Sequence, residues 1–117
     1  MRNRGEIWLA DLNPRVGTEP GKTRPVVVVQ AQALLDAGHP STLVVPLTTQ
    51  LVDDAEPLRI RIGASSRLEK DSDALVDQVR AIDNRRLVNG PLTRLSAAQS
   101  EALDAALLEV LDLTGDS

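Results

Sequence analysis

The chain's 117 residues are enough for one domain with a single hydrophobic core, and its formal net charge is −4. The chain has no cysteine, which excludes disulfides and thiolate chemistry, and its single aromatic residue excludes RNA-binding modules that stack bases on several aromatic rings. With one histidine and no thiol, a zinc site would have to be built almost wholly from carboxylates. Residues 95–117 hold five acidic and no basic side chains, so the other 94 residues carry 13 basic against 12 acidic groups, and this balance does not exclude an RNA partner.

The first predicted elements are two strands separated by a loop. Residues 5–12 mix apolar and polar positions as a half-buried strand does, whereas residues 24–30 include a run of four valines that leaves no wet face. Between them, residues 13–23 contain two glycines and two prolines, which favour a loop. The loop therefore runs directly into a buried strand that begins with Arg24.

A short helix and two further strands are expected next. Residues 31–37 are predicted to form the helix, and residues 42–48 a second buried strand, in which Pro46 implies a bulge or an edge position. In residues 58–62 every second side chain is aliphatic, so the two arginines between them share the opposite face.

The last third of the chain predicts two more strands and a C-terminal helix. Residues 74–82 have strand character, residues 83–86 form a turn, and residues 88–95 contain a short final strand. Ser96 and Gln99 form a capping box that opens the helix. The expected apolar face of this helix consists of Leu103, Leu107, Val110 and Leu111. Gly115 is the expected end of the helix.

About six short strands followed by one long helix indicate a single α+β domain spanning residues 1–117, with a small antiparallel, barrel-like sheet. The connections are too short for the crossover helices of a parallel sheet. No apolar run approaches the ~20 residues of a membrane span, and no signal-peptide pattern follows the first residues. We therefore expect a cytoplasmic protein with no membrane partner.

Arg24, where the loop meets the strand, is the first candidate functional residue. A guanidinium stays protonated and offers five donors in a planar fork, which suits a phosphate clamp, although a strand-end arginine can equally pair with a carboxylate. Thr48, Thr49 and Gln50 follow the second buried strand, where they either form a turn or offer a hydroxyl to the same phosphate. If the two buried strands pair antiparallel, Arg24 and Thr48 lie side by side.

Other polar side chains also have both a functional and a structural interpretation. Arg15 and Lys22 make the loop basic, and Glu19 is either a general base or a solvated loop charge. Within the predicted strand 74–82, at least one polar side chain must face inward and needs a partner or a cleft. These side chains are Asp77, Gln78 and Arg80.

Four motifs occur in order along the chain: Arg-Gly-Glu-Ile-Trp at 4–8, Gly-Thr-Glu-Pro-Gly-Lys-Thr-Arg-Pro at 17–25, Val-Pro-Leu-Thr-Thr-Gln at 45–50 and Leu-Val-Asp-Gln-Val-Arg-Ala-Ile-Asp at 75–83. With these motifs, the chain resembles the MazF/PemK toxins over nearly its whole length. The resemblance implies the family's fold, a small SH3-like, barrel-like sheet of the CcdB/MazF type with a C-terminal helix.

The resemblance also implies a function: the toxin of a type II toxin–antitoxin system, acting as a ribosome-independent endoribonuclease (an mRNA interferase). By analogy, Arg24 and Thr48 are the catalytic pair, and Glu19 stands at a family position in the loop. The implied partners are single-stranded RNA, a second copy of the chain in a homodimer, and a MazE-like antitoxin whose tail fills the RNA groove. The side chains expected to bind RNA are Arg15, Thr18, Lys22, Thr49, Gln78 and Arg80.

The chemistry suits this small set of functional groups, because RNA supplies its own nucleophile, the 2′-OH. A fixed guanidinium and a hydroxyl can stabilise the charge that builds on the phosphorus, so we expect neither a metal nor a cofactor, although counting carboxylates does not exclude magnesium. The expected products carry a 2′,3′-cyclic phosphate and a 5′-OH. Pro20 and Lys22 depart from the usual family loop, which leaves the cleavage sequence open.

The alternative is a gyrase poison of the CcdB type, which shares the fold but cuts nothing. Those toxins depend on a C-terminal end similar to Trp-Gly-Ile, whereas this chain ends in Thr-Gly-Asp-Ser. A catalytically inactive interaction domain is a third reading. The presence of both Arg24 and Thr48 favours the endoribonuclease over either alternative.

Overall fold

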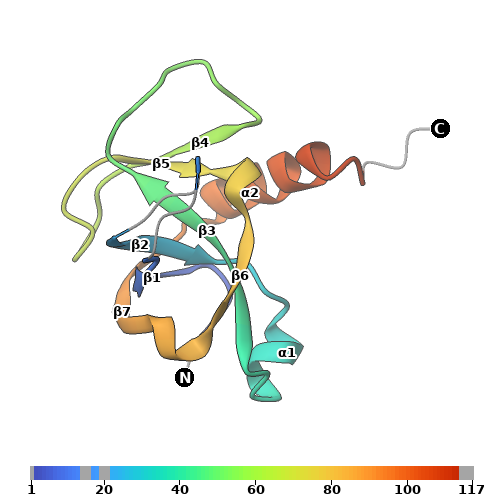
Figure 1. The fold of residues 1–117 in the computed structure, drawn as a ribbon. Coiled ribbons are helices and arrows are strands. Elements are labelled where there is room, and N and C mark those ends of the chain that lie inside the picture. The colour runs from blue at the N-terminus through green and yellow to red at the C-terminus, as the bar shows by residue number, and fades with distance from the viewer. Residues whose placement is uncertain (1, 14–16, 19–21, 114–117) are drawn as a thin grey trace.

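The computed structural model describes residues 2–13, 17–18 and 22–113. In this part of the chain, seven antiparallel strands form one sheet, and a C-terminal helix crosses one side of it (Figure 1). The strands are β1 (Glu6–Asp11), β2 (Thr23–Val28), β3 (Ser41–Thr48), β4 (Arg59–Ile62), β5 (Ser72–Leu75), β6 (Arg80–Asp83) and β7 (Leu87–Arg94). The helices are α1 (Gln32–Asp36), the 3₁₀ turns η1 (Val76–Gln78) and η2 (Asn84–Arg86), and α2 (Ala97–Val110).

The strand order is β4-β5-β3-β2-β1-β7, with β6 pairing with the first half of β3. The sheet curls but does not close, because β4 and β7 remain its two ends. The connection between β4 and β5 reaches across towards β7, where the Arg67 N–H donates to the Leu92 carbonyl at 3.0 Å. The predicted α+β class, antiparallel sheet and C-terminal helix are confirmed. The predicted count of six strands is wrong, because η1 divides the stretch 74–82 into β5 and β6.

Pro46 lies in an interior strand, so the edge position that it suggested is wrong. On one side β3 pairs with β2 from Val44 to Pro46, and on the other it changes partner, from β6 at Val44 to β5 at Leu47. Main-chain polar groups alternate in direction along a strand, and Leu43 bonds towards β2 through its carbonyl, so Pro46 faces the side where the partner changes. The ladder is interrupted there, and the missing N–H costs no hydrogen bond.

Apolar side chains pack on both faces of the sheet. Val27 and Leu47 belong to a core that includes Leu103 from α2, whereas Val26 and Val44 belong to a second cluster on the opposite face. All of these valines are fully buried, as the unbroken apolar runs of β2 and β3 predicted. The two central strands are therefore held from both faces.

The capping box of α2 is confirmed, with Ser96 Oγ accepting from the Gln99 N–H at 3.1 Å and Gln99 Oε1 accepting from the Ser96 N–H at 2.8 Å. The predicted apolar face is correct except for Leu111, which caps the helix and is half exposed. The helix ends at Val110, so it does not extend to Gly115, which lies outside the described residues. No helix in the described ranges is both long and apolar enough to cross a membrane.

Gly90 in β7 gives a test of how closely the second cluster is packed. A Cβ at this position would overlap the ring of Trp8, which is held by the Arg2 guanidinium 5.4 Å from its centroid and by a hydrogen bond from its Nε1 to Glu6 at 3.1 Å. Gly90→Ala should lower the free energy of unfolding by about 2 kcal/mol and change the emission of this sole tryptophan. Urea unfolding followed by fluorescence measures both effects.

Gly63→Ala is the matched control, because its Cβ would meet no atom closer than Asp71 Oδ1 at 4.0 Å. This variant should keep the wild-type stability and emission. Equal effects of the two substitutions would contradict the packing described for Trp8.

Candidate functional site

An open cleft of about 720 Å³ lies where β2 begins and β3 ends. Its walls come from the loop before β2, from the end of β3 and the residues after it, and from the β4–β5 hairpin. Six of the side chains that the sequence singled out lie in this wall: Thr18, Lys22, Arg24, Thr48, Thr49 and Gln50. Arg59 joins them as a third cation beside Lys22 and Arg24.

The register of β2 and β3, extended beyond the last paired residues, brings Arg24 across from Thr48. The strands pair antiparallel, with Val26 opposite Pro46 and Val27 opposite Val45, so one further step of two residues brings Arg24 across from Thr48. The Arg24 Nη1 donates to the carbonyl of Leu47 at 3.3 Å, which directs the guanidinium towards the end of β3. The antiparallel pairing of the two buried strands, on which the expected neighbourhood of Arg24 and Thr48 depended, is present.

Thr48 presents its hydroxyl as a donor at the end of β3. The Oγ1 atom accepts a hydrogen bond from the N–H of Gln50 at 3.2 Å, and this contact fixes the position of the oxygen. A hydroxyl that accepts a bond still has its own proton to donate. Arg24 and Thr48 together can therefore offer a permanent cation and a neutral donor to one anionic group.

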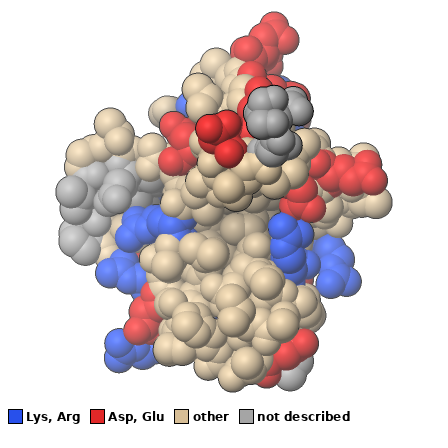
Figure 2. Space-filling model, turned by 90° about the vertical axis from the view of Figure 1, so that its right-hand side faces the viewer, with Lys and Arg blue, Asp and Glu red and all other residues tan. Residues whose placement is uncertain are grey.

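The cleft is basic although the chain is acidic. Lys22, Arg24 and Arg59 line it, and no acidic side chain of the described residues does. The acidic side chains gather elsewhere: on the face shown in Figure 2, most Asp and Glu residues lie in the upper half, and Lys and Arg residues lie mainly at mid-height. Local charge, rather than net charge, determines what such a cleft attracts. Within the described ranges, no group of three or more His, Cys, Asp or Glu side chains could hold a metal ion.

A buried carboxylate, Asp73, orders the wall of the cleft formed by β4 and β5. Its side chain is 1% exposed and accepts from Arg61 Nε at 2.6 Å, from Arg59 Nη1 at 3.2 Å and from the N–H of Val52 at 2.8 Å. Burial alone would raise the pKa of Asp73, but these three donors outweigh it and hold the pKa below its usual value. Asp73 is therefore ionised at neutral pH.

Two of the predicted RNA-binding side chains do not lie in this cleft. Gln78 belongs to η1 and Arg80 to β6, where it pairs with Val44 rather than with the end of β3 that carries Thr48. The sequence placed them in one strand with residues 74 and 75, and the turn η1 redirects the chain between these positions. Arg15 and Glu19 lie outside the described residues.

Arg59 is the cleft residue that the sequence did not assign. The alternation in residues 58–62 correctly put both arginines on the polar face of β4, with Ile60 and Ile62 buried. Which arginine reaches the cleft depends on how β4 and β5 sit beside β3, and this long-range pairing leaves no local signal in the sequence.

A family model described as "PemK-like, MazF-like toxin of type II toxin-antitoxin system" matches residues 3–111. The chain belongs to this family. It is 36% identical over 108 residues to Endoribonuclease EndoA of Bacillus subtilis (strain 168), with 89% of each chain covered. The resemblance predicted from the four motifs is therefore confirmed, and the comparisons do not favour the gyrase-poison alternative.

Solved structures show the same fold. MazF (Form-I) from Deinococcus radiodurans superposes with a TM-score of 0.78 at 20% identity, covering 95% of this chain and 96% of that one. An endoribonuclease in complex with its cognate antitoxin, from a mycobacterial species, superposes with a TM-score of 0.76 at 20% identity, covering 99% of this chain and 100% of that one. At these identities, the likeness establishes the fold alone.

Asp73→Asn tests the network in the cleft wall. Two guanidinium groups and one N–H would lose a charged acceptor, so the free energy of unfolding should fall by about 2 kcal/mol at pH 7. The folded-state pKa lies below the ordinary value of 3.8, so the carboxylate stabilises the fold above that value and loses this effect as the pH falls through the lower folded pKa. The gap between wild type and variant, measured by urea unfolding, should therefore shrink below about pH 4.

Asp54→Asn is the control, because this exposed carboxylate lines a second pocket together with Asp73 and accepts none of the hydrogen bonds found among the described residues. Its stability should follow that of the wild type at every pH. A gap for Asp73→Asn that stays constant from pH 7 to pH 3 would contradict the assignment of an ionised, stabilising carboxylate.

Proposed function

We propose that this chain is a metal-independent, sequence-specific endoribonuclease that cleaves single-stranded RNA, including mRNA, as the toxin of a type II toxin–antitoxin system. The proposal is supported chiefly by one observation: Arg24 and Thr48 line the same basic cleft, where β2 begins and β3 ends, in a member of the MazF/PemK family. Both side chains extend from buried strands, so the geometry that they offer to a phosphate is fixed before RNA arrives.

In the proposed reaction, the ribose 2′-oxygen bonds to the phosphorus while the bond from phosphorus to the 5′-oxygen breaks. The products are a 2′,3′-cyclic phosphate and a 5′-OH. Arg24 stabilises the negative charge on the phosphorane and protonates the leaving 5′-oxygen, and Thr48 donates to a non-bridging oxygen. An arginine is a poor base because of its high pKa, so the proton of the 2′-OH needs another acceptor. Glu19, in the loop before β2, is the candidate for this role.

RNA binding is assigned first to the cleft. Lys22 supplies a second cation there, and Thr18 and Thr49 supply hydroxyl donors beside Arg24 and Thr48. Arg15, which lies outside the described residues, is proposed to add a further cation for RNA, and Gln78 and Arg80 are proposed to contact RNA only where it continues beyond the cleft.

The proposed partners follow from the family. We propose a homodimer, with RNA lying along a groove shared by the two copies, and inhibition by a MazE-like antitoxin that occupies this groove. The structural neighbour solved in complex with its cognate antitoxin supports the proposed antitoxin partner. The proposed site of action is the cytoplasm, where mRNA is the available substrate.

Incubation with a long single-stranded RNA in EDTA, followed by mapping of cut sites and end groups, tests the activity. We expect discrete cuts with cyclic-phosphate ends, and no cutting of DNA of the same sequence, since DNA lacks the 2′-OH. Arg24→Ala should lower the rate of cleavage at least ~100-fold, because the main charge stabiliser of the transition state is lost. Thr48→Ala should lower it about 10-fold, as expected for the loss of one neutral donor.

Arg85→Ala is the control for removal of an arginine, because Arg85 lies in η2 outside the cleft lining, is 90% exposed and bonds to Asp83 at the end of β6. It should cut at the wild-type rate. Near wild-type cleavage by Arg24→Ala would remove the central role assigned to that residue, and intact RNA with folded wild-type protein would refute the proposed activity.

The homodimer is tested by sedimentation of the purified chain at micromolar concentration. We expect the mass of two copies, each of 12.6 kDa. A monomer under these conditions would rule out a groove shared by two copies, while leaving the chemistry at Arg24 open to the cleavage test.

A further inference from the structure

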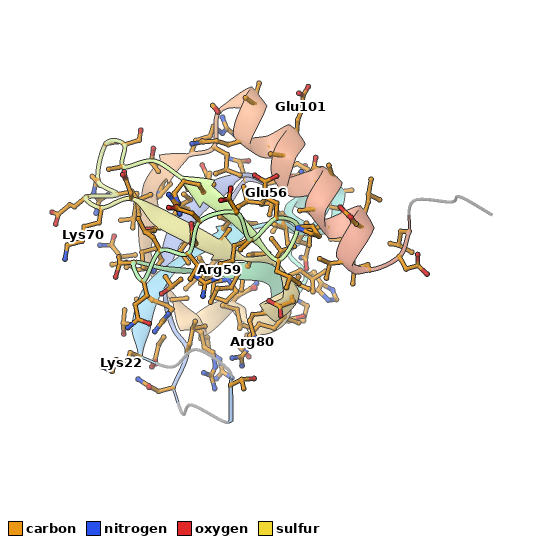
Figure 3. All side chains as sticks on the ribbon, turned by 90° about the horizontal axis from the view of Figure 1, so that it is seen from above. Lys22, Glu56, Arg59, Lys70, Arg80 and Glu101 are labelled. Atoms are coloured by element: carbon orange, nitrogen blue, oxygen red, sulfur yellow. The ribbon has the colours of Figure 1, made fainter. Side chains whose placement is uncertain are left out.

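Arg59 lines the same cleft as Arg24 and Thr48, and the proposed reaction gives it no role. It projects from β4, which pairs with β5, and β5 pairs in turn with the end of β3. Seen from above, Arg59 lies over the sheet, between Glu56 on one side and Lys22, the residue before β2, on the other (Figure 3).

The Arg59 guanidinium is held in place on its protein side. Its Nη1 atom donates to Asp73 Oδ2 at 3.2 Å and to the Gln50 carbonyl at 2.8 Å. Asp73 is itself immobilised by burial and by its two other donors. An arginine anchored in this way loses little further conformational entropy when it binds a ligand.

The same contacts connect Arg59 to the catalytic pair. Gln50 accepts from Arg59 through its carbonyl and donates through its N–H to Thr48 Oγ1 at 3.2 Å. One residue therefore sets the relative positions of the Arg59 guanidinium and the Thr48 hydroxyl. The two groups are fixed relative to each other, as neighbouring contacts to a single RNA strand must be.

Arg59 also has donors that are not used within the fold. Both of its hydrogen bonds come from Nη1, and no described residue accepts from its Nη2 or Nε. Its side chain is 25% exposed, so solvent reaches it. The remaining N–H groups are suited to the oxygens of a phosphodiester.

The charge changes sign on the far side of Arg59. A second pocket shares Arg59 with the cleft, and it is lined by Asp53, Asp54, Glu56 and Asp73, with Arg61 as its only other cation among the described residues. A polyanion can follow the basic cleft as far as Arg59, and beyond this point it would meet mostly carboxylates.

We propose that Arg59 binds the RNA phosphate next to the scissile one, and that the acidic pocket beyond it ends the RNA path on that side. This inference rests on the proposed ribonuclease function and assigns a subsite to it. Arg59 fixes the position of the strand, and the scissile phosphate remains with Arg24 and Thr48.

The test combines protein and RNA substitutions. A 12-nucleotide RNA around a mapped cut site is prepared with one neutral methylphosphonate at each phosphate in turn, except the scissile one. For the wild type, the neutral group next to the cut on one side should lower kcat/KM about 10-fold or more. On unmodified RNA, Arg59→Gln should have a kcat/KM lower than the wild type by a similar factor. On the RNA with the neutral group next to the cut, its kcat/KM should fall no further. Neutral groups farther out on the same side should have no effect on either protein.

Arg61→Gln is the matched control, because Arg61 shares Asp73 and the same face of β4 but lines only the acidic pocket. If Arg61→Gln lowers kcat/KM, the methylphosphonate next to the cut should lower it further by the same factor as in the wild type. The inference is overturned if every methylphosphonate lowers kcat/KM of Arg59→Gln by the same factor as in the wild type. It is also overturned if Arg59→Gln and Arg61→Gln lose activity equally. Arg59→Lys keeps the charge and should recover part of the loss, which covers the case in which Arg59→Gln folds poorly.

Binding separates this inference from the proposed function. A 12-nucleotide RNA with a 2′-deoxy nucleotide at the cut site, or a mixed-sequence RNA of that length if the wild type cuts nothing, is titrated over a range of salt concentrations. Loss of one phosphate contact should reduce the slope of log K against log salt by about 0.7 for Arg59→Gln and leave it unchanged for Arg61→Gln. Failure to cut would refute the ribonuclease, whereas unchanged slopes for both variants would refute the Arg59 subsite.

Discussion

The antiparallel register of β2 and β3 is the constraint on which the rest of the site depends. Val26 pairs with Pro46 and Val27 with Val45, and the same register brings Arg24 to Thr48. The valines are buried on both faces of the sheet, so a slip of one residue would exchange the two faces and separate the polar pair. The geometry of the candidate catalytic groups is therefore determined by the hydrophobic cores, and sequence changes in the surrounding loops need not move Arg24 or Thr48.

The row of paired residues continues beyond this pair. Thr48 pairs with Asp73, and Asp73 pairs with Arg61, so charged or polar residues occupy neighbouring positions across successive strands. A buried carboxylate is costly on its own, but here three donors satisfy it. In return, it offsets part of the repulsion that Arg59 would feel from Arg24 and Lys22 in an empty cleft. The network thus allows several cations to converge on one surface before any phosphate is bound.

The fold and part of the site could be predicted from local sequence because their signals are local. A valine run after a glycine-rich loop locates Arg24, and a buried run followed by polar residues locates Thr48. The division of residues 74–82 by η1 and the role of Pro46 could not be read in this way, since both depend on β3 changing partners. Arg59 was missed for the same reason. Alternation in the sequence predicts which side chains share one face of a strand, but only long-range pairing determines which other residues lie next to that face.

The distribution of charge explains how an acidic protein can hold a polyanion. Exposed charges separated by more than about 8 Å are largely screened at physiological salt, so the potential within the cleft is set mainly by the charges that line it, which are Lys22, Arg24 and Arg59. A protein that lacks a broad basic field binds nucleic acid weakly outside its site. Affinity must then come from a few fixed contacts, and each of them is tied to a particular phosphate. For a nuclease, this arrangement directs the binding energy to RNA that is positioned for cleavage, instead of to RNA held anywhere on the surface.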